Sequence, residues 1–517
     1  MKHSLVFAFA FSAGFSISQS IVFEKGPDIP GYIEMIKPLY ADSVRMFCFM
    51  KTGNRTYWMQ KYDTRTFGLS EEYLLPLVDS ANPYIEEPVH LFKVNYLVPF
   101  YHNQKRQLRK GFYMFSAEYG ADTSRFISMR ENEKLLITPD EKREQFFISS
   151  LEKVNKKGEW MVLNVEGYDK SLNRMYAARD SVPAKGDSYY LLQNAVSDEK
   201  GDLWALMYVQ PRKGDKYHLL FHFSRSGKKL SRSLVKTIDK LDHSYLVISP
   251  GGKKLIMGTL VGTVGKTIKF SVITHAVVYH TEDDGKITAR NAIPVSAQVQ
   301  WIRPGQDENK NPLIVPKDMG FVEARYFSDS TVTLVYEQSG VSKMPVEGGE
   351  TYTYYNGGVW LVTFTKKGVF VKMSFVPKYQ LNKIESYYEE KNLSLLGVNI
   401  SWTKTYTSGN RNIELFFSHH LLKYGDRELV IFNDHRNNLR FDPSAYDAAK
   451  NPVLPLKSFE NACLHAWETS PSPKHWPVAG ETDNSLMLTS SCYSNGNFIV
   501  GVFDDGKKWY WGKIIPN

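Results

Sequence analysis

The stretch FIVGVFDDGKKWYW, residues 498–511, carries the pattern that decides the fold. A short run of apolar and aromatic residues leads into a turn rich in Asp, Gly and Lys, and a second aromatic run follows. Short runs of this kind, bounded by turn residues, are typical of β-strands, and Asp-Gly between two of them is a strong signal for a hairpin. The stretch therefore predicts two antiparallel strands that reverse at Asp505-Gly506.

The same strand-turn-strand unit recurs along the chain. Further copies run from Tyr57 to Tyr62 before Asp63-Thr64, Phe112 to Phe115 before Tyr119-Gly120, Leu219 to Phe223 before Ser226-Gly227, His275 to Tyr279 before Asp284-Gly285, and Trp360 to Phe364 before Lys367-Gly368. Weaker copies near Gly167-Tyr168-Asp169 and at Asn433-Asp434 fill the two widest gaps. The average spacing is roughly 60 residues, somewhat longer than a compact propeller blade.

This repetition predicts an all-β chain folded as a β-propeller, because a hairpin cannot bury its apolar face alone and stacked sheets supply the core. Aromatic residues make up 14% of the chain, which favours sheets whose flat side chains pack across strands. Division of the length by the spacing gives six to eight blades, with seven as the favoured number. Two stacked β-sandwich domains are the alternative, since they would also show short, regularly spaced strands.

One segment departs from the β pattern. Thr138-Pro139-Asp140-Glu141 has the features of a helix start, with Thr at the N-cap, Pro at the first helical position and Glu three residues after the cap. Phe147, Leu151 and Val154 then share a face at helical spacing. We expect a β-propeller domain over residues 19–517 with a helical insertion at 138–157 that packs against its side or rim.

The first 18 residues have the three regions of a secretory signal peptide. Met1-Lys2-His3 is a positive start, Leu5 to Phe15 is apolar, and Ser16-Ile17-Ser18 supplies small residues before a cleavage point at Gln19. The apolar part is about half the length of a membrane-spanning helix, and no later segment is long and uncharged enough to span, so we expect no transmembrane anchor. The sequence predicts a secreted or periplasmic protein.

The charge balance is basic but diffuse. Lys and Arg number 64 against 55 Asp and Glu, and the densest groups are short, such as Lys105-Arg106 with Arg109-Lys110. Proteins that bind nucleic acid concentrate their positive charge in a patch or stripe. This dispersion and the predicted export exclude nucleic acid as a partner and leave a protein or glycan ligand at the cell envelope.

Cysteine and histidine residues give little sign of redox or metal chemistry. Cys48 lies in an alternating run that predicts a buried core position, while a disulfide between Cys463 and Cys492 is possible in an exported chain. His218 and His222 are four apart in a strand pattern, too far apart to hold one metal ion. We therefore expect no metal and no cofactor.

Two sets of residues are candidates for ligand binding. Asp434, His435 and Arg436 place an acid, a possible base and a guanidinium at the end of a strand, where propeller loops converge. Turn stabilisation by Asn and Asp chemistry is the alternative for this loop. Trp467 and Trp476 could stack on a sugar ring or a peptide, with core packing as their alternative. No residue set in the sequence identifies a catalytic site.

Three turns resemble the Asp-box of sialidase-like propellers, Ser/Thr-x-Asp-x-Gly-x-Thr-Trp. They are Ser197 to Trp204, Thr281 to Gly285 and Asp504 to Trp509. The first copy has Glu199 at the Asp position, the second lacks the Trp, and the third begins at Val502. In that family the box is a structural turn away from the catalytic face, so the resemblance implies a fold and no activity.

The mature chain also resembles exported, uncharacterised β-propeller proteins of Bacteroidota. The resemblance rests on the signal-peptide end before Gln19, the strand end Phe432-Asn433-Asp434-His435, and short acceptor patterns for O-glycosylation at Asp42-Ser43-Val44, Asp79-Ser80-Ala81, Asp180-Ser181-Val182 and Asp329-Ser330-Thr331. Because no residue set in the sequence identifies a catalytic site, we expect a binding or scaffold module at the cell envelope rather than an enzyme. A glycan-active hydrolase on a sialidase-like propeller is the alternative function.

Overall fold

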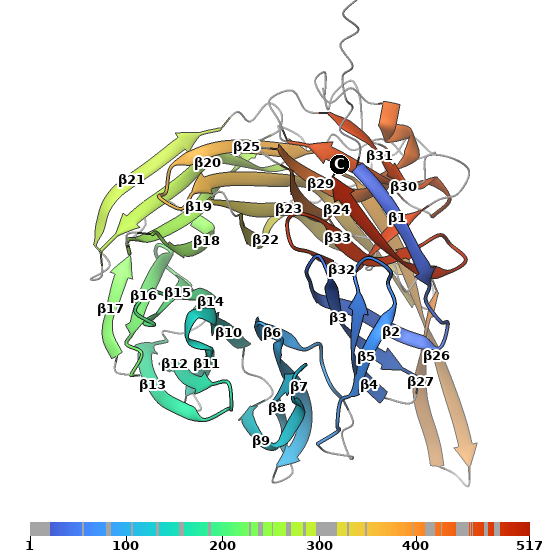
Figure 1. The fold of residues 1–517 in the computed structure, drawn as a ribbon, viewed down its shortest axis with the longest axis horizontal. Coiled ribbons are helices and arrows are strands. Elements are labelled where there is room, and N and C mark those ends of the chain that lie inside the picture. The colour runs from blue at the N-terminus through green and yellow to red at the C-terminus, as the bar shows by residue number, and fades with distance from the viewer. Residues whose placement is uncertain are drawn as a thin grey trace, which may run out of the picture.

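The structure is a computed structural model, and its described strands form a closed ring of sheets around a central axis (Figure 1). It describes residues 21–516 except 54–55, 79–83, 105–106, 131–133, 155–159, 185–187, 227–228, 236–240, 251, 265–269, 283–285, 296–317, 328–329, 347–348, 396–397, 409–418, 425–426, 441–453, 455, 457–458, 470–473 and 480–485. The predicted signal peptide, residues 1–18, lies outside the described residues.

The described strands group into eight sheets, which we number as blades 1 to 8 along the ring. Blade 1 contains β2 (Ile33–Ala41), β3 (Arg45–Thr52), β4 (Thr56–Asp63) and β5 (Leu69–Leu74), and blade 2 contains β6 (Val89–Phe92), β7 (Asn95–Gln104), β8 (Gln107–Ser116) and β9 (Gly120–Arg130). Blade 3 contains β10 (Lys134–Asp140), β11 (Gln145–Val154), β12 (Trp160–Asp169) and β13 (Arg174–Pro183), with the 3₁₀ turn η1 (Glu141–Arg143) between its first two strands. Blade 4 contains β14 (Tyr189–Ser197), β15 (Leu203–Gln210), β16 (Tyr217–Phe223) and β17 (Lys229–Val235).

The second half of the ring follows the same order. Blade 5 contains β18 (Leu241–Ile248), β19 (Lys254–Val264), β20 (Phe270–Thr281) and β21 (Ile287–Pro294). Blade 6 contains β22 (Asp318–Tyr326), β23 (Thr331–Val346), β24 (Gly349–Thr365), β25 (Phe370–Val376), β26 (Gln380–Leu395) and β27 (Val398–Ser408). Blade 7 contains β28 (His419–Tyr424), β29 (Arg427–His435), β30 (Ala462–Glu468) and β31 (His475–Ala479), with the 3₁₀ turns η4 (Arg436–Arg440) and η6 (Phe459–Asn461) between β29 and β30.

Blade 8 closes the ring by joining the two ends of the described chain. It contains β32 (Met487–Ser494), β33 (Ile499–Asp504), β34 (Trp509–Pro516) and β1 (Ile21–Asp28), in that order across the sheet. β1 pairs antiparallel with β34, so that Ile21 lies opposite Pro516. The first strand after the predicted signal peptide therefore completes the last blade (Figure 1).

Apolar side chains are buried between each pair of neighbouring blades. Eight hydrophobic clusters fill the eight junctions, one cluster to a junction. Cys48 belongs to the cluster between blades 8 and 1 and is fully buried, which confirms its predicted core position. Because every blade contributes to two clusters, the core is shared around the whole ring. The predicted β-propeller is confirmed, and its eight sheets fall within the predicted range of six to eight.

Two general features of the ring position the site. In each blade of the antiparallel meander, the turn after the first strand and the turn after the third strand emerge on the same face, which we call the turn face. Blade 6 is extended, because β26 pairs with the first half of β24 and β27 pairs with β26, and these strands project away from the ring (Figure 1). Among the described residues, no helix has the length and apolar character needed to cross a membrane.

The predicted helix at 138–157 is wrong. Residues 138–140 end β10, Glu141–Arg143 form a single 3₁₀ turn, and Gln145–Val154 form strand β11 in the middle of blade 3. Phe147 and Leu151 are four apart, and this spacing places two residues on one face of a strand as well as on one face of a helix. Both side chains pack in the cluster between blades 3 and 4. The shared apolar face that predicted a helix is therefore the buried face of strand β11.

Candidate functional site

A cavity of about 410 Å³ opens on the turn face between blades 2 and 3. Four turns build it: β6–β7 around Lys93, β8–β9 around Tyr119, β10–β11 around Glu144, and β12–β13 around Leu172. The lining residues are Lys93, Val94, Asn95, Met114, Ser116, Glu118, Tyr119, Gly120, Asp122, Arg125, Glu144, Lys170, Ser171 and Leu172. The volume falls within the range of roughly 300–1,000 Å³ that is usual for small-molecule sites.

Three of the turns hold a non-glycine residue in the left-handed region of backbone space. The φ angles of Lys93, Glu144 and Leu172 are 51°, 50° and 60°. The described chain has five such residues, and three of them line this one cavity. A side chain with a Cβ rarely adopts this conformation, because it costs on the order of 1 kcal/mol or more. Strain of this kind gathers at binding and catalytic sites more often than elsewhere.

Hydrogen bonds hold the strained turns in place. The carboxylate of Asp169 accepts hydrogen bonds from the backbone N–H groups of Ser171 and Asn173, each at 2.9 Å. The N–H of Leu172 donates to the carbonyl of Asp169 at 3.1 Å. The turn between β12 and β13 is thus fixed before any ligand arrives, which lowers the entropy lost on binding.

Charged groups of both signs surround the cavity in equal number. Lys93, Arg125 and Lys170 carry positive charge, and Glu118, Asp122 and Glu144 carry negative charge. The carboxylate of Glu144 pairs with Lys170 at 2.7 Å and with Lys93. Hydrogen bonds from Lys170 and Lys93 lower the pKa of Glu144 to about 2, so it is ionised at any ordinary pH. The site therefore has no net charge of its own.

The rim of the cavity carries the most exposed of the large hydrophobic side chains in the described residues. Tyr119 is 88% exposed and stands beside Gly120, whose φ of 77° allows the turn into β9. Arg125 donates a hydrogen bond to the side chain of Asn173 at 2.8 Å, which ties blade 2 to blade 3 across the cavity. An exposed ring next to fixed donors and acceptors is suited to bind a polar ligand that also has a flat apolar face.

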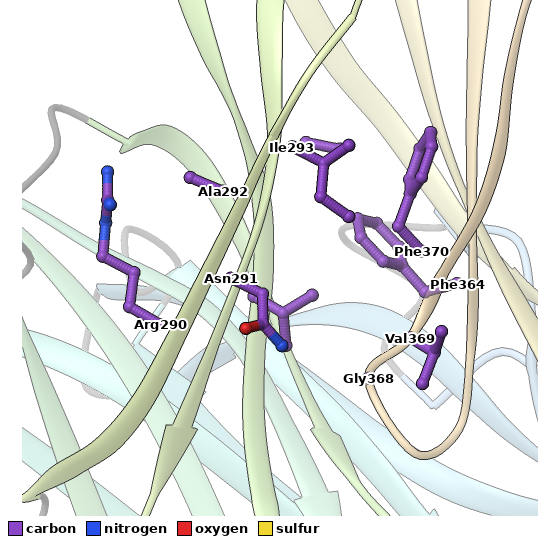
Figure 2. Close-up of a pocket in the computed structure, with 10 residues that line it drawn as sticks. Arg290, Asn291, Ala292, Ile293, Phe364, Gly368, Val369 and Phe370 are labelled. Carbon is purple, nitrogen blue, oxygen red and sulfur yellow. The ribbon is translucent and has the colours of Figure 1, made fainter.

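A second cavity of about 330 Å³ lies between β21 of blade 5 and the β24–β25 turn of blade 6 (Figure 2). Figure 2 shows Ile293, Phe364 and Phe370 on one side and Asn291 at the centre, with Arg290 on the far side of β21. Its wall is mainly apolar, and the positive φ of 83° at Gly368 lets the turn approach it. None of its lining residues is acidic.

The structure places the predicted residues Asp434, His435 and Arg436 at the end of β29 and the start of η4. Asp434 is 2% exposed, and one of its oxygens accepts hydrogen bonds from the N–H of His435 and the side chain of Asn438, both at 2.8 Å. The other oxygen lies 3.1 Å from Nδ1 of the buried His465. This geometry fits the turn-stabilising alternative, and ligand binding by Asp434, His435 and Arg436 stays a prediction.

The two predicted tryptophans lie in blade 7 at different depths. Trp467 is 4% exposed and belongs to the cluster between blades 6 and 7, while Trp476 packs against the cluster between blades 7 and 8. The ring of Trp467 stands edge-on to His475 at 5.2 Å. The burial of Trp467 fits the core-packing alternative, and ligand binding by Trp467 and Trp476 stays a prediction.

The possible disulfide between Cys463 and Cys492 is absent, since both residues are thiols. Cys463 is buried in β30, opposite Asp434 of β29. The sulfur of Cys492 instead lies 2.8 Å from Nε2 of His420. Burial raises the pKa of Cys492 and lowers that of His420 to about 3, so the pair is a neutral thiol and a neutral imidazole. A neutral thiol is a poor nucleophile.

Two of the Asp-box-like turns share one feature, a hydrogen bond from a Trp indole to an Asp carboxylate. Trp509 donates to Asp504 at 2.9 Å, and Trp204 donates to Asp198 at 3.1 Å. In the first copy, Glu199 occupies the Asp position of the motif. The residue that accepts the hydrogen bond from the tryptophan is instead its neighbour Asp198. These turns stabilise the fold, as the resemblance implied.

Asp198, Asp202 and His222 bring their ligand-type atoms within 4.8 Å of one another. Each carboxylate already accepts hydrogen bonds from the chain: Asp198 from Trp204, and Asp202 from His222 at 3.1 Å. The ring of His222 also stacks on that of Trp204 at 3.7 Å. The group therefore supports the turn at the start of β15, and it does not offer a vacant set of ligands.

The fold and the cavity define a β-propeller with a polar pocket on its turn face. No protein-family model matches the chain, and no curated protein matches it. Similar solved structures include a protein of unknown function from Bacteroides caccae, with 9% identity over 65% of this chain and 94% of that chain and a TM-score of 0.28.

Two further similar structures have named roles. One is the periplasmic gluconolactonase PpgL of Pseudomonas aeruginosa, with 10% identity over 82% of this chain and 96% of that chain and a TM-score of 0.36. The other is the WD40 domain of SCAP from fission yeast, with 10% identity over 96% of this chain and 98% of that chain and a TM-score of 0.33. At such identities the similarity concerns the fold alone, and function has to be argued from the site.

Only part of the cavity between blades 2 and 3 has a signal in the amino-acid sequence. The pair Tyr119-Gly120 is a turn signal in the sequence. Nothing in the local sequence marks the side chain of Tyr119 as a binding residue. The lining residues come from four turns spread between Lys93 and Leu172, and each turn taken alone is an ordinary polar loop. Positive φ at Lys, Glu and Leu follows from tertiary packing and has no local sequence signature.

Proposed function

We propose that the protein is an exported β-propeller that binds a protein or glycan ligand at the cell envelope, and that the cavity between blades 2 and 3 holds this ligand. The observation that carries the proposal is the gathering of Lys93, Glu144 and Leu172, each with positive φ, around one cavity. Evolution retains such strain where a fixed geometry is useful, and ligand recognition is such a use.

Two of the three carboxylates that line this cavity, Glu144 and Asp122, fit binding better than hydrolysis. A glycosidase needs one carboxyl group with a raised pKa to protonate the leaving group. The pKa of Glu144 is held at about 2 by Lys170 and Lys93, and hydrogen bonds from Ser124 lower the pKa of Asp122. Neither group retains a proton at neutral pH, so neither is suited to act as a general acid.

Export belongs to the proposal as well. The signal peptide over residues 1–18 is its basis, and the mature chain would begin at Gln19. N-terminal sequencing of the protein recovered outside the cytoplasm should give Gln19 as the first residue. An intact Met1 on the exported protein would contradict cleavage at this point.

A binding assay with a rim variant tests the role of the cavity. We expect the mature protein on a sensor surface to bind either isolated envelope polysaccharide or a purified envelope protein. Glu118→Arg on the rim should weaken that binding at least ten-fold. Glu282→Arg, which changes another exposed glutamate in blade 5, is the matched control and should leave binding unchanged. Equal binding by both variants, or no binding to any fraction, would overturn the proposal.

A further inference from the structure

Four properties of the cavity between blades 2 and 3 restrict the chemistry of its ligand: charge balance, the pairing of Glu144, the separation of donors from acceptors, and the exposed ring of Tyr119. The inference below rests on the proposed binding function, because it names the class of ligand for the same site.

The charge balance disfavours a ligand that carries a net charge. The lining has three cationic and three anionic side chains, so their fields largely cancel at the centre of the cavity. Glu144 is also held by two lysines, with Lys170 at 2.7 Å. An anionic ligand would compete with Glu144 for both lysines, and a cationic ligand would compete with the lysines for Glu144. A neutral ligand can be bound without breaking this arrangement.

The lining separates hydrogen-bond donors from acceptors. Lys93, Lys170 and Arg125 supply donors, while the carboxylates of Glu118 and Asp122 supply acceptors. A hydroxyl group donates and accepts at once, so one hydroxyl can bridge an ammonium and a carboxylate. A ligand with several hydroxyls around one ring would satisfy both kinds of group together.

Tyr119 supplies the apolar contact that such a ligand also needs. Its ring is 88% exposed and stands beside Gly120, whose φ of 77° allows the turn at the rim. The faces of sugar rings present C–H groups, which pack on flat aromatic side chains. An exposed aromatic ring that has no packing role in the described chain is available for this contact.

We propose that this cavity is a carbohydrate site that binds a neutral sugar unit. The ring of Tyr119 stacks on the sugar ring, and the hydroxyl groups of the sugar form hydrogen bonds with the basic and acidic side chains. The open cavity can take a single unit at the end of a chain or one unit within it. The protein would then hold neutral glycans by one face of the ring of blades.

Titration calorimetry with short saccharides tests the ligand class. The panel contains neutral maltotriose, cellotriose, xylotriose and mannotriose, the anionic trigalacturonate, and the cationic trimer of glucosamine. We expect at least one neutral trisaccharide to bind the mature protein, and to bind more tightly than either charged one. A charged saccharide as the tightest ligand, or no binding by any member, would overturn the inference.

Variants at Tyr119 test the mode of binding. Tyr119→Ala should weaken the bound saccharide at least ten-fold, while Tyr119→Phe, which keeps the ring, should stay within about three-fold. Tyr32→Ala removes another exposed tyrosine, 69% exposed, and should leave binding unchanged. Wild-type affinity for Tyr119→Ala would overturn the inference.

The two proposals fail in different ways. If no saccharide binds but a purified envelope protein does, and Glu118→Arg loses that protein, the binding function stands and the carbohydrate inference is wrong. If neither saccharides nor envelope fractions bind, both are wrong. Because Tyr119 and Glu118 are exposed, thermal unfolding of the variants should match that of the wild type, which separates lost binding from lost folding.

Discussion

The interior of blades 6 and 7 and the turn face of blades 2 and 3 both contain ion pairs, and they use them differently. Lys378 and Glu337 pair with side chains that are 0% and 9% exposed, and His419 lies 3.7 Å from the same carboxylate. Glu144 pairs with Lys170 and Lys93 where the two lysines are 58% and 70% exposed. Buried partners depend on each other for stability, whereas exposed partners can exchange with water or a ligand.

The same contrast applies to the polar clusters at strand ends. In blade 7 the carboxylate of Asp434 is bonded to the chain and contacts His465 in the interior. In blades 2 and 3 the polar groups stand around a cavity that is open to a ligand. The difference indicates that polar clusters at strand ends support the fold where they are buried, and are available for recognition where they surround a cavity.

Loss of one partner of the buried pair should have the largest effect. Lys378→Met leaves the carboxylate of Glu337 buried without its cation, and we expect the free energy of unfolding to fall by about 3–5 kcal/mol. The measurement is urea unfolding at pH 7. Lys93→Met, which removes an exposed lysine, should cost less than about 1 kcal/mol. Equal losses for the two variants would contradict the contrast.

The second largest effect should come from acid, which protonates Glu337 and so lowers the free energy of unfolding. Burial alone raises the pKa of Glu337, but the charges of Lys378 and His419 outweigh this and lower it to about 2, below its ordinary value of 4.5. A carboxylate with a lowered pKa in the folded state stabilises the protein at pH above 4.5, and this contribution is lost as the pH falls towards 2. The loss is up to about 3 kcal/mol, at about 1.4 kcal/mol for each pH unit.

Urea unfolding between pH 2.5 and pH 7 measures this dependence. The variant Lys378→Met is the test, because without the lysine burial dominates and the pKa of Glu337 should rise. Its stability should then fall less steeply in acid than that of the wild type. Parallel curves for the two proteins would show that Glu337 does not carry the effect.

Truncation of the buried carboxylate in blade 7 should cost less. Asp434→Ala removes the acceptor for Asn438 and for the N–H of His435, and we expect a loss of about 1–3 kcal/mol in unfolding free energy. Asp122→Ala on the turn face is the matched control and should change stability by less than about 1 kcal/mol. If Asp434 instead serves a ligand alone, its variant would be as stable as the control.

Most of the fold could be predicted from the sequence because strand alternation and turn chemistry are local. The eight hairpin signals, including the weak ones at Gly167-Tyr168-Asp169 and Asn433-Asp434, fall one in each of the eight blades. Division of length by spacing favoured seven, because the extra strands of blade 6 and the long β29–β30 connection make the repeat uneven. The helix at 138–157 was wrong because a spacing of four residues fits a strand and a helix equally.

The site was less accessible to sequence reasoning than the fold. Asp434, His435 and Arg436 stood out because they are adjacent in sequence, and adjacency of polar residues is also how a turn satisfies its own backbone. Lys93 and Tyr119 come from two turns of blade 2, and Leu172 joins them only when blade 3 packs against blade 2. A cavity assembled from separate turns becomes visible only once the register of the blades is known.

Substitution of Glu144 should have the smallest effect on stability and a clear effect on ligand binding. Glu144→Gln removes the charge that holds Lys93 and Lys170 but keeps the shape of the side chain, and exposed pairs of this kind contribute at most about 1 kcal/mol. We expect unfolding to change little and affinity for a neutral trisaccharide to fall several-fold, because Lys93 and Lys170 lose the carboxylate that holds these two donors in place. Calorimetry of the variant with trigalacturonate gives the sharper test: if charge balance excludes anions, this ligand should now bind more tightly than it does to the wild type. Unchanged selectivity between the neutral and the anionic saccharide would show that the charges around the cavity do not choose its ligand.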